Sequence, residues 1–173
     1  VQYGLRALEL LQSLPLETHL VMSKSAELTL HHELKSCYED IRGLADVCHP
    51  VRNVAAPIAS GSFLTRGMLI APCSIRTLGE ITTGVTSSLL TRAADVVLKE
   101  RRRLVLMVRE TPLHLGHLRN MASVTEMGAI VAPPVPAFYA EPDSLDAIIT
   151  QSVGRCLDLF DIDLSDTRRW MET

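Results

Sequence analysis

The sequence predicts an α/β protein with a mostly parallel, doubly wound sheet. Short apolar segments such as 68–71 and 104–108 alternate with longer segments in which apolar residues recur at helical spacing. A capping residue or a proline stands where these segments give way to a helix, as Ser74 and Pro112 do. This alternation is typical of parallel strands joined by crossover helices.

The first expected helix covers 2–14, because its leucines fall on one helical face. A strand over 17–22 follows, and Ser23 or Ser25 opens the next helix. In doubly wound folds a central strand and its phosphate-binding loop precede the first helix. We therefore expect that about 10–15 residues upstream of Val1 supply them.

The rest of the chain continues the alternation within one domain, residues 1–173, because no repeat or linker divides it. The proline run 133–136 is expected to be irregular. Helices are expected over 38–48, from 75, and over 88–100, 113–127 and 144–160, with strands over 68–71, 104–108 and 129–132.

Composition excludes several classes of protein. A formal net charge of −3 and 4% aromatic residues give no basis for binding nucleic acid. No apolar run approaches the ~18 residues that a membrane helix needs, so we expect no membrane span. The four cysteines form no C-x-x-C pair, which argues against a zinc or redox site and favours a reduced, cytoplasmic protein without a bound metal.

The end of the apolar segment 104–108 is the strongest candidate site. Arg109 and Glu110 follow it directly, and Pro112 leads into a helix. Ligands of open α/β sheets bind outside the carboxyl ends of the strands, where a helix N-terminus favours an anion. The junction predicts a phosphate-bearing ligand beside a carboxylate that can move protons, and a structural ion pair is an equal alternative.

A second strand-to-helix turn contains Ser74 and Thr77. Their hydroxyls and the free N–H groups of the helix start suit a phosphate or the polar edge of a heterocycle, although helix capping by Ser74 alone is the favoured explanation. Cys73 has no neighbouring base in the sequence, so we interpret it as a small buried thiol.

Two cations lie on one face of the helix over 88–100. Arg92 and Lys99 are separated by two turns, and the apolar neighbours of Arg92 call for an anionic partner such as a phosphate. We interpret 101–103 as a solvated helix end.

Several further polar residues can be explained by structural roles alone. His114 and His117 suit surface or capping roles better than a metal site, because no third ligand is apparent. Tyr139 follows the rigid proline run, which could hold its hydroxyl over a site, and for Arg155 an ordinary surface salt bridge is the default.

Taken together and in order, six strings resemble the flavin prenyltransferase (UbiX) family. The likeness covers nearly the whole chain. The strings are THLVMSK at 18–24, SGSF at 60–63, PCS at 72–74, RAADVVLKER at 92–101, RETPLH at 109–114 and PPVPAFY at 133–139.

The resemblance implies a Rossmann-like flavoprotein fold, a three-layer sandwich, and a metal-independent transferase. Members join a dimethylallyl group from dimethylallyl monophosphate to N5 and then C6 of reduced FMN. The prenylated FMN passes to a UbiD-type decarboxylase. Members assemble as homotrimers or dodecamers with sites at subunit interfaces. They begin with a strand and a Gly-Ala-Ser-Gly-type loop, which we expect upstream of Gln2.

The resemblance also implies roles for individual residues. FMN would contact Ser23, Ser74, Ile75, Arg76, Thr77 and Arg109. The prenyl phosphate would be bound by Arg92, Lys99, Tyr139 and Arg155, some from a neighbouring subunit. Glu110 and Glu33 would manage protons, and Ser60 and Trp170 are further candidates near the site.

Two alternatives keep the flavin and change the function. A flavin-dependent cysteine decarboxylase of the same fold would carry an Asn-bearing Pro-Ala-Ser-Ala-Asn-type motif, where this chain has Ala-Pro-Cys-Ser-Ile-Arg at 71–76. A non-catalytic FMN carrier would not need the phosphate-binding set, which argues for catalysis.

Overall fold

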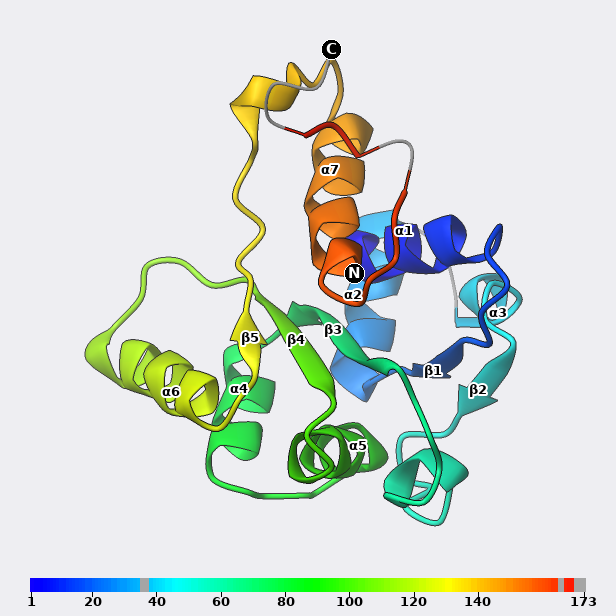
Figure 1. Ribbon diagram of the computed structural model, residues 1–173, viewed down its shortest axis with the longest axis vertical. Helices are drawn as coiled ribbons and strands as arrows, with labels where there is room; N and C mark the ends of the chain where they lie inside the picture. Colours follow the sequence, from blue (N-terminus) through cyan, green and yellow to red (C-terminus); the bar gives the residue numbers. More distant parts are fainter. Residues whose placement is uncertain (35–37, 165–166, 170–173) are drawn as a thin grey trace.

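The computed structural model describes residues 1–34, 38–164 and 167–169 (Figure 1). The helices are α1 (Gln2–Leu11), α2 (Lys24–Leu34), α3 (Tyr38–Arg42), α4 (Ile75–Thr82), α5 (Leu89–Lys99), α6 (Leu115–Glu126) and α7 (Leu145–Asp158), with short 3-10 turns η1 (Pro57–Ala59) and η2 (Phe138–Ala140). The strands are β1 (His19–Val21), β2 (Val47–His49), β3 (Gly67–Cys73), β4 (Arg103–Val108) and β5 (Ile130–Val131).

All the strand pairs are parallel, which confirms the predicted α/β class. The strands form two sheets, a pair of order β1-β2 and a three-stranded sheet of order β3-β4-β5. A cavity of about 630 Å³ is lined by both sheets and by α1. Its walls include residues of β1 and β3, so it lies between the two sheets.

The central strand β4 is buried on both faces, as expected for a three-layer sandwich. Leu104, Leu106 and Val108 pack into one apolar cluster with residues of α4, α5 and α6. Val105 and Met107 point the other way, into a cluster with α1 and α7. Figure 1 shows the same division, with α4, α5 and α6 on one side of the sheet and α1 and α7 on the other. Such double burial explains why 104–108 contains no polar residue.

Most element predictions are confirmed, including the cap at Ser74, and Ser88 and Ser144 also cap the helices whose predicted starts they mark. Ser74, Ser88 and Ser144 each accept a hydrogen bond from the backbone N–H three residues on, at the start of α4, α5 and α7. Among the described residues, no helix is long and apolar enough to cross a membrane.

The helix predicted over 38–48 is wrong in its second half. α3 ends at Arg42, and Val47–His49 pairs with β1 as a strand. The carboxylate of Asp46 fixes this pairing, because it accepts hydrogen bonds from the backbone N–H and the hydroxyl of Thr18, both at 2.7 Å. Such a long-range contact has no local sequence signal.

Several other boundaries differ from the predictions by a few residues, such as the end of α1 at Leu11 rather than at 14, and two of these differences have a visible cause. β3 continues through Pro72 to Cys73, with an irregular register after Ile70, because strand pairing with β4 persists there. α6 begins at Leu115 rather than at 113, because His114 is its N-cap and accepts a hydrogen bond from Gly116 N–H through Nδ1.

Candidate functional site

Three strands of the two sheets deliver polar residues to one cavity. Ser23 follows the end of β1, Ser74 follows β3, and Arg109 follows β4, and all three line the cavity between the sheets. The carboxyl ends of parallel strands share one edge, so residues far apart in sequence meet there. The geometry identifies this edge as the candidate site.

The first turn of α4 presents hydrogen-bond donors at this edge. The Ser74 hydroxyl accepts a bond from Thr77 N–H at 3.2 Å and lies 3.0 Å from the Thr77 hydroxyl. The first bond within the helix runs from Leu78 N–H to the Ser74 carbonyl, so the N–H groups of Ile75 and Arg76 precede the helical ladder. Ser74 is therefore a cap, as predicted, and the same turn leaves backbone donors for a ligand.

The electrostatics of the cavity favour an anionic or electron-rich ligand. α2 and α4 both begin at the cavity, and a helix N-terminus carries a partial positive charge. The charged side chains in the lining are Arg66, Arg102 and Arg109 against Glu17. Of these, Arg109 lies at the carboxyl edge, beside the start of α4, because its N–H bonds to the Cys73 carbonyl.

One buried group at this edge restricts the chemistry. Burial raises the pKa of the Cys73 thiol to about 12, so it stays protonated and is no nucleophile, as the sequence predicted. At the other end of β3, the Thr65 hydroxyl lines the cavity and is buried without a hydrogen-bond partner among the described residues. Hydroxyls, backbone N–H groups and a guanidinium together suit a phosphorylated heterocycle, and this donor set fits FMN.

Comparison with known proteins agrees with this fit. The Flavoprotein family model matches residues 2–156. The flavin prenyltransferase UbiX of Neisseria meningitidis serogroup B is 57% identical over 169 residues, which cover 98% of this chain and 89% of that protein. The chain belongs to the UbiX flavin prenyltransferase family.

Solved structures of UbiX proteins match closely. AnUbiX (PadA1) in complex with FMN and dimethylallyl pyrophosphate superposes with a TM-score of 0.97 at 51% identity, over 99% of this chain and 92% of that one. A dodecameric FMN-dependent UbiX-like decarboxylase from Escherichia coli O157:H7 gives 0.96 at 45% identity, over 99% and 93% of the two chains.

The predicted acids lie in different places. Glu110 is exposed beside Arg109, and its carboxylate accepts a hydrogen bond from Thr111 N–H at 3.0 Å. Glu33 is exposed on the last turn of α2 and pairs with the Val1 amine at 3.3 Å. Since α2 rises about 1.5 Å per residue, Glu33 lies roughly 15 Å along that helix from Ser23. Val1, its partner, also lines the cavity, so Glu33 lies beside another part of the cavity wall, and the proton-transfer roles of both acids stay predictions.

The junction after β4 also differs from its prediction. A cation, a carboxylate and free helix N–H groups were expected at one point, but α6 begins six residues after Arg109 and is already capped by His114. Glu110–Leu113 form a loop that bends at Thr111 and Pro112, because the residue before a proline avoids the helical conformation. The helix N-terminus at the site is that of α4 instead.

The four predicted prenyl-phosphate residues of this UbiX-family chain are not gathered within one protomer. Arg92 donates to the Ala59 carbonyl at 3.2 Å and to Asp95 at 2.9 Å, so Asp95 is an anionic partner of Arg92 within the protomer. Lys99 pairs with Glu100. Lys99 precedes β4 and Arg109 follows it, and six residues of strand span about 20 Å.

The remaining candidates are also dispersed. Tyr139 lies on η2, beyond the proline run and away from the sheet, and Arg155 on α7 pairs with Asp158, the surface salt bridge that was the default. The Ser60 hydroxyl lies 2.9 Å from that of Ser62 in the loop before β3. Trp170 lies outside the described residues.

Sequence reasoning missed Arg102, which was interpreted as part of a solvated helix end. The residue is partly buried, and its guanidinium donates to the carbonyls of Phe63 at 2.7 Å and Gly61 at 2.6 Å. The rings of His114 and His117 are in contact, tilted by 31° with centroids 3.5 Å apart, and the predicted capping role of His114 is confirmed. No group of three potential metal ligands occurs among the described residues.

Proposed function

We propose that this chain is a flavin prenyltransferase that moves the dimethylallyl group of dimethylallyl monophosphate to N5, and then C6, of reduced FMN. The observation that carries the proposal is the cavity at the strand ends, where Ser23, the Ser74–Thr77 turn and Arg109 present a donor set for FMN. It is supported by the UbiX relatives and by the ligands of AnUbiX, FMN and dimethylallyl pyrophosphate.

The reduced flavin supplies the electron-rich nucleophile when bound, so no protein nucleophile is required. The Ser74–Thr77 turn and Arg109 orient the flavin in the cavity. As the carbon–oxygen bond of the prenyl phosphate breaks, negative charge grows on the departing phosphate. Arg92 and Lys99, with Arg155 and Tyr139, stabilise that charge, most strongly where the site excludes water.

Glu110 is the residue that we assign to proton transfer. It lies next to Arg109 at the edge of the site, and its carboxylate has a hydrogen bond only from Thr111 N–H among those found in the described residues. It can donate a proton to the leaving phosphate or accept one from the flavin ring. Glu110→Gln should retain FMN binding and slow prenylation, and unchanged turnover would refute the role.

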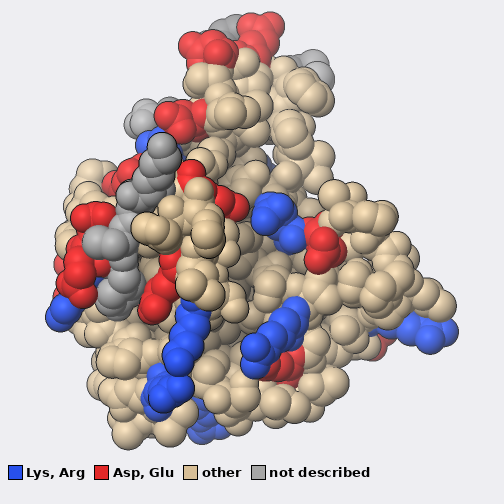
Figure 2. All heavy atoms as spheres, turned by 180° about the vertical axis from the view of Figure 1, so that it is seen from behind, with Lys and Arg blue, Asp and Glu red and all other residues tan. Residues whose placement is uncertain are grey.

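We further propose that the phosphate-binding cations reach the flavin from a second copy of the chain in a trimer or dodecamer. Lys99 is too far from Arg109 of its own protomer, as the length of β4 requires. Large apolar side chains such as Phe138 and Leu145, each 79% exposed, suit burial against another protomer. Figure 2 shows that much of one face is uncharged, which also favours association.

Co-expression of two inactive variants tests this sharing of residues. In random oligomers of Arg109→Ala and Lys99→Ala chains, half the chains supply an intact Arg109 and half an intact Lys99, so about one quarter of the sites are complete. Activity should therefore recover to about one quarter of wild type. No recovery would place both residues in one protomer's site.

The mass of the flavin after anaerobic incubation tests the reaction itself. Reduced FMN and dimethylallyl monophosphate should yield a flavin heavier by one dimethylallyl unit. A carrier or a decarboxylase would return FMN of unchanged mass, and a peptidyl-cysteine decarboxylase would instead remove carbon dioxide from a peptide. Delivery of the product to a UbiD-type decarboxylase and a cytoplasmic location remain predictions, the first tested by restoring activity to a flavin-free decarboxylase.

A further inference from the structure

The backbone carbonyls of the loop before β3 bind to α5 and to the turn that follows it. The carbonyl of Ala59 accepts from Arg92 at 3.2 Å, and those of Gly61 and Phe63 accept from the two terminal nitrogens of Arg102 at 2.6 and 2.7 Å. Three carbonyls at alternate positions therefore point to two guanidinium groups. We call residues 59–63 the carbonyl loop.

The carbonyl loop also supports Lys99 directly. A Cβ added at Gly61 would collide with the Glu100 carboxylate and come within 2.8 Å of the Lys99 ammonium. The ion pair of Lys99 and Glu100 therefore lies against the bare backbone of Gly61. Any larger residue there would displace the ammonium group, because the colliding atoms are the ends of flexible side chains.

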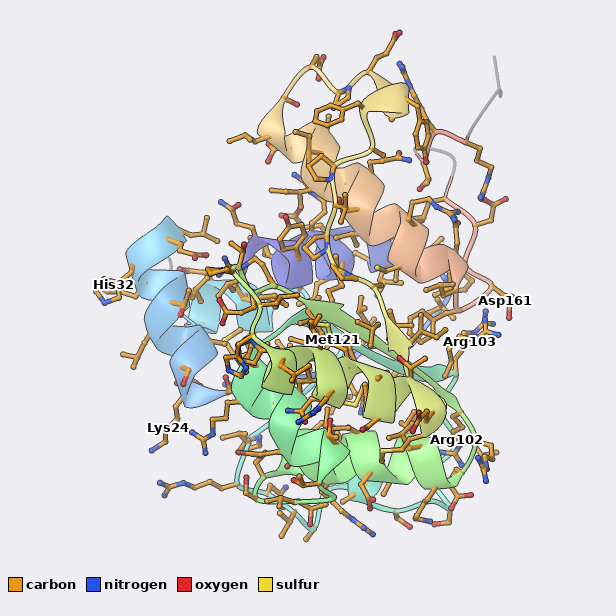
Figure 3. The ribbon with its side chains drawn as sticks, turned by 90° about the vertical axis from the view of Figure 1, so that its left-hand side faces the viewer. Lys24, His32, Arg102, Arg103, Met121 and Asp161 are labelled. Carbon is orange, nitrogen blue, oxygen red and sulfur yellow. The ribbon has the colours of Figure 1, made fainter. Side chains whose placement is uncertain are left out.

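A tight turn sets the position of Arg102. Arg101 has a left-handed φ of 58°, which ends α5, and the N–H of Arg102 bonds back to the Val97 carbonyl at 2.9 Å. The turn places Arg102 one residue before β4, so both its backbone and its side chain are anchored. Figure 3 shows Arg102 at this end of α5, with the exposed Arg103 beside Asp161 nearby.

We propose that Arg102 is a positioning residue for the prenyl phosphate. By holding the carbonyl loop against α5, it keeps Arg92 and Lys99 in the arrangement that receives the phosphate. This inference rests on the proposed function, in which Arg92 and Lys99 bind that group. Only an arginine satisfies both carbonyls at once, because its planar fork carries parallel donors and a lysine ammonium does not.

Arg102→Lys tests the proposal, with Arg103→Lys as the matched control. Arg103 is the next residue, and its ion pair with Asp161 is 3.7 Å long and exposed. Arg102→Lys should raise KM for dimethylallyl monophosphate about tenfold, with kcat and the Kd for FMN within about twofold of wild type. Calorimetric affinity for dimethylallyl monophosphate, measured on protein loaded with oxidised FMN, should fall by the same factor without turnover. Arg103→Lys should change neither the KM nor the calorimetric affinity for dimethylallyl monophosphate.

Gly61→Ala provides a second variant that leaves Arg102 intact. It should displace Lys99 and reproduce the rise in KM, which tests whether the carbonyl loop places Lys99 for the phosphate. If Arg102→Lys fails to fold, Arg102→Gln, which also lacks the guanidinium fork, takes its place with the same expected rise in KM. Unchanged KM in either folded variant, or a fall in kcat and FMN affinity at constant KM, would overturn the positioning role. A wild-type protein that neither binds nor consumes dimethylallyl monophosphate would instead overturn the proposed function.

Discussion

Replacing Ser74 by alanine separates the structural role of this residue from its role in the site. The variant loses the helix cap from Thr77 N–H at 3.2 Å and the contact with the Thr77 hydroxyl at 3.0 Å. Loss of a serine N-cap costs about 1 kcal/mol, which lowers Tm by about 2–4 °C in a chain of this size. If the hydroxyl also contacts the ligand, a further hydrogen bond of about 1 kcal/mol disappears from the complex, so FMN affinity should fall about five- to tenfold.

Ser88→Ala is the control for this experiment. Ser88 caps α5 in the same way, with a bond from Thr91 N–H at 3.4 Å, and it does not line the cavity. Both variants should lose a similar amount of free energy of unfolding in urea titrations, and only Ser74→Ala should weaken binding in fluorescence titrations with FMN. Equal FMN affinity in the two variants would refute our assignment of the Ser74 turn to the flavin.

Three other predictions follow from burial and protonation. Burial and the neighbouring His19 lower the pKa of His49 below its usual 6.5, so the unfolded chain binds more protons than the folded one near that pH. The free energy of unfolding should therefore fall as the pH drops through that value, and His49→Gln should remove this pH dependence. A urea midpoint that stays constant between about pH 7.5 and 5.5 would contradict the prediction. Partly exposed Cys48 should react with iodoacetamide before Cys73, which is buried and whose thiol has a pKa of about 12. Peptide mass spectrometry measures the alkylation of each cysteine, and equal alkylation rates would be inconsistent with the fold. Leu106→Ala on the fully buried central strand should lower the free energy of unfolding by about 2–5 kcal/mol, against at most about 0.5 for Leu28→Ala, whose side chain is exposed on α2. Similar losses for both variants would show that β4 is not central.

The central layer of the fold was predictable because its sequence signals are local and strong. The run at 104–108 is apolar on both faces, and Ser74, Ser88 and Ser144 each mark a helix start in the sequence. β2 was not predictable in the same way. Val47–His49 is a strand because of its pairing with β1 and the Asp46–Thr18 contact, which join residues 28 positions apart.

The residues of the candidate site likewise include some that the sequence could predict and some that it could not. The residues around Ser74 and Arg109 could be placed together because each follows a strand, and parallel strands end at one edge. The distance between Lys99 and Arg109 was also predictable, because the strand between them separates its two ends by about 20 Å. The role of Arg102 was not predictable, because a basic run at a helix end normally faces solvent and its bonds to the carbonyls of Gly61 and Phe63 are long-range.

A crystal structure of the protein soaked with oxidised FMN is the most direct test of the account. We predict flavin density at the carboxyl edge, with the ring or its phosphate bonded to the N–H groups of Ile75 and Arg76 and to the Arg109 guanidinium. Density elsewhere on the chain, or a flavin that leaves Arg109 and the first turn of α4 untouched, would contradict it.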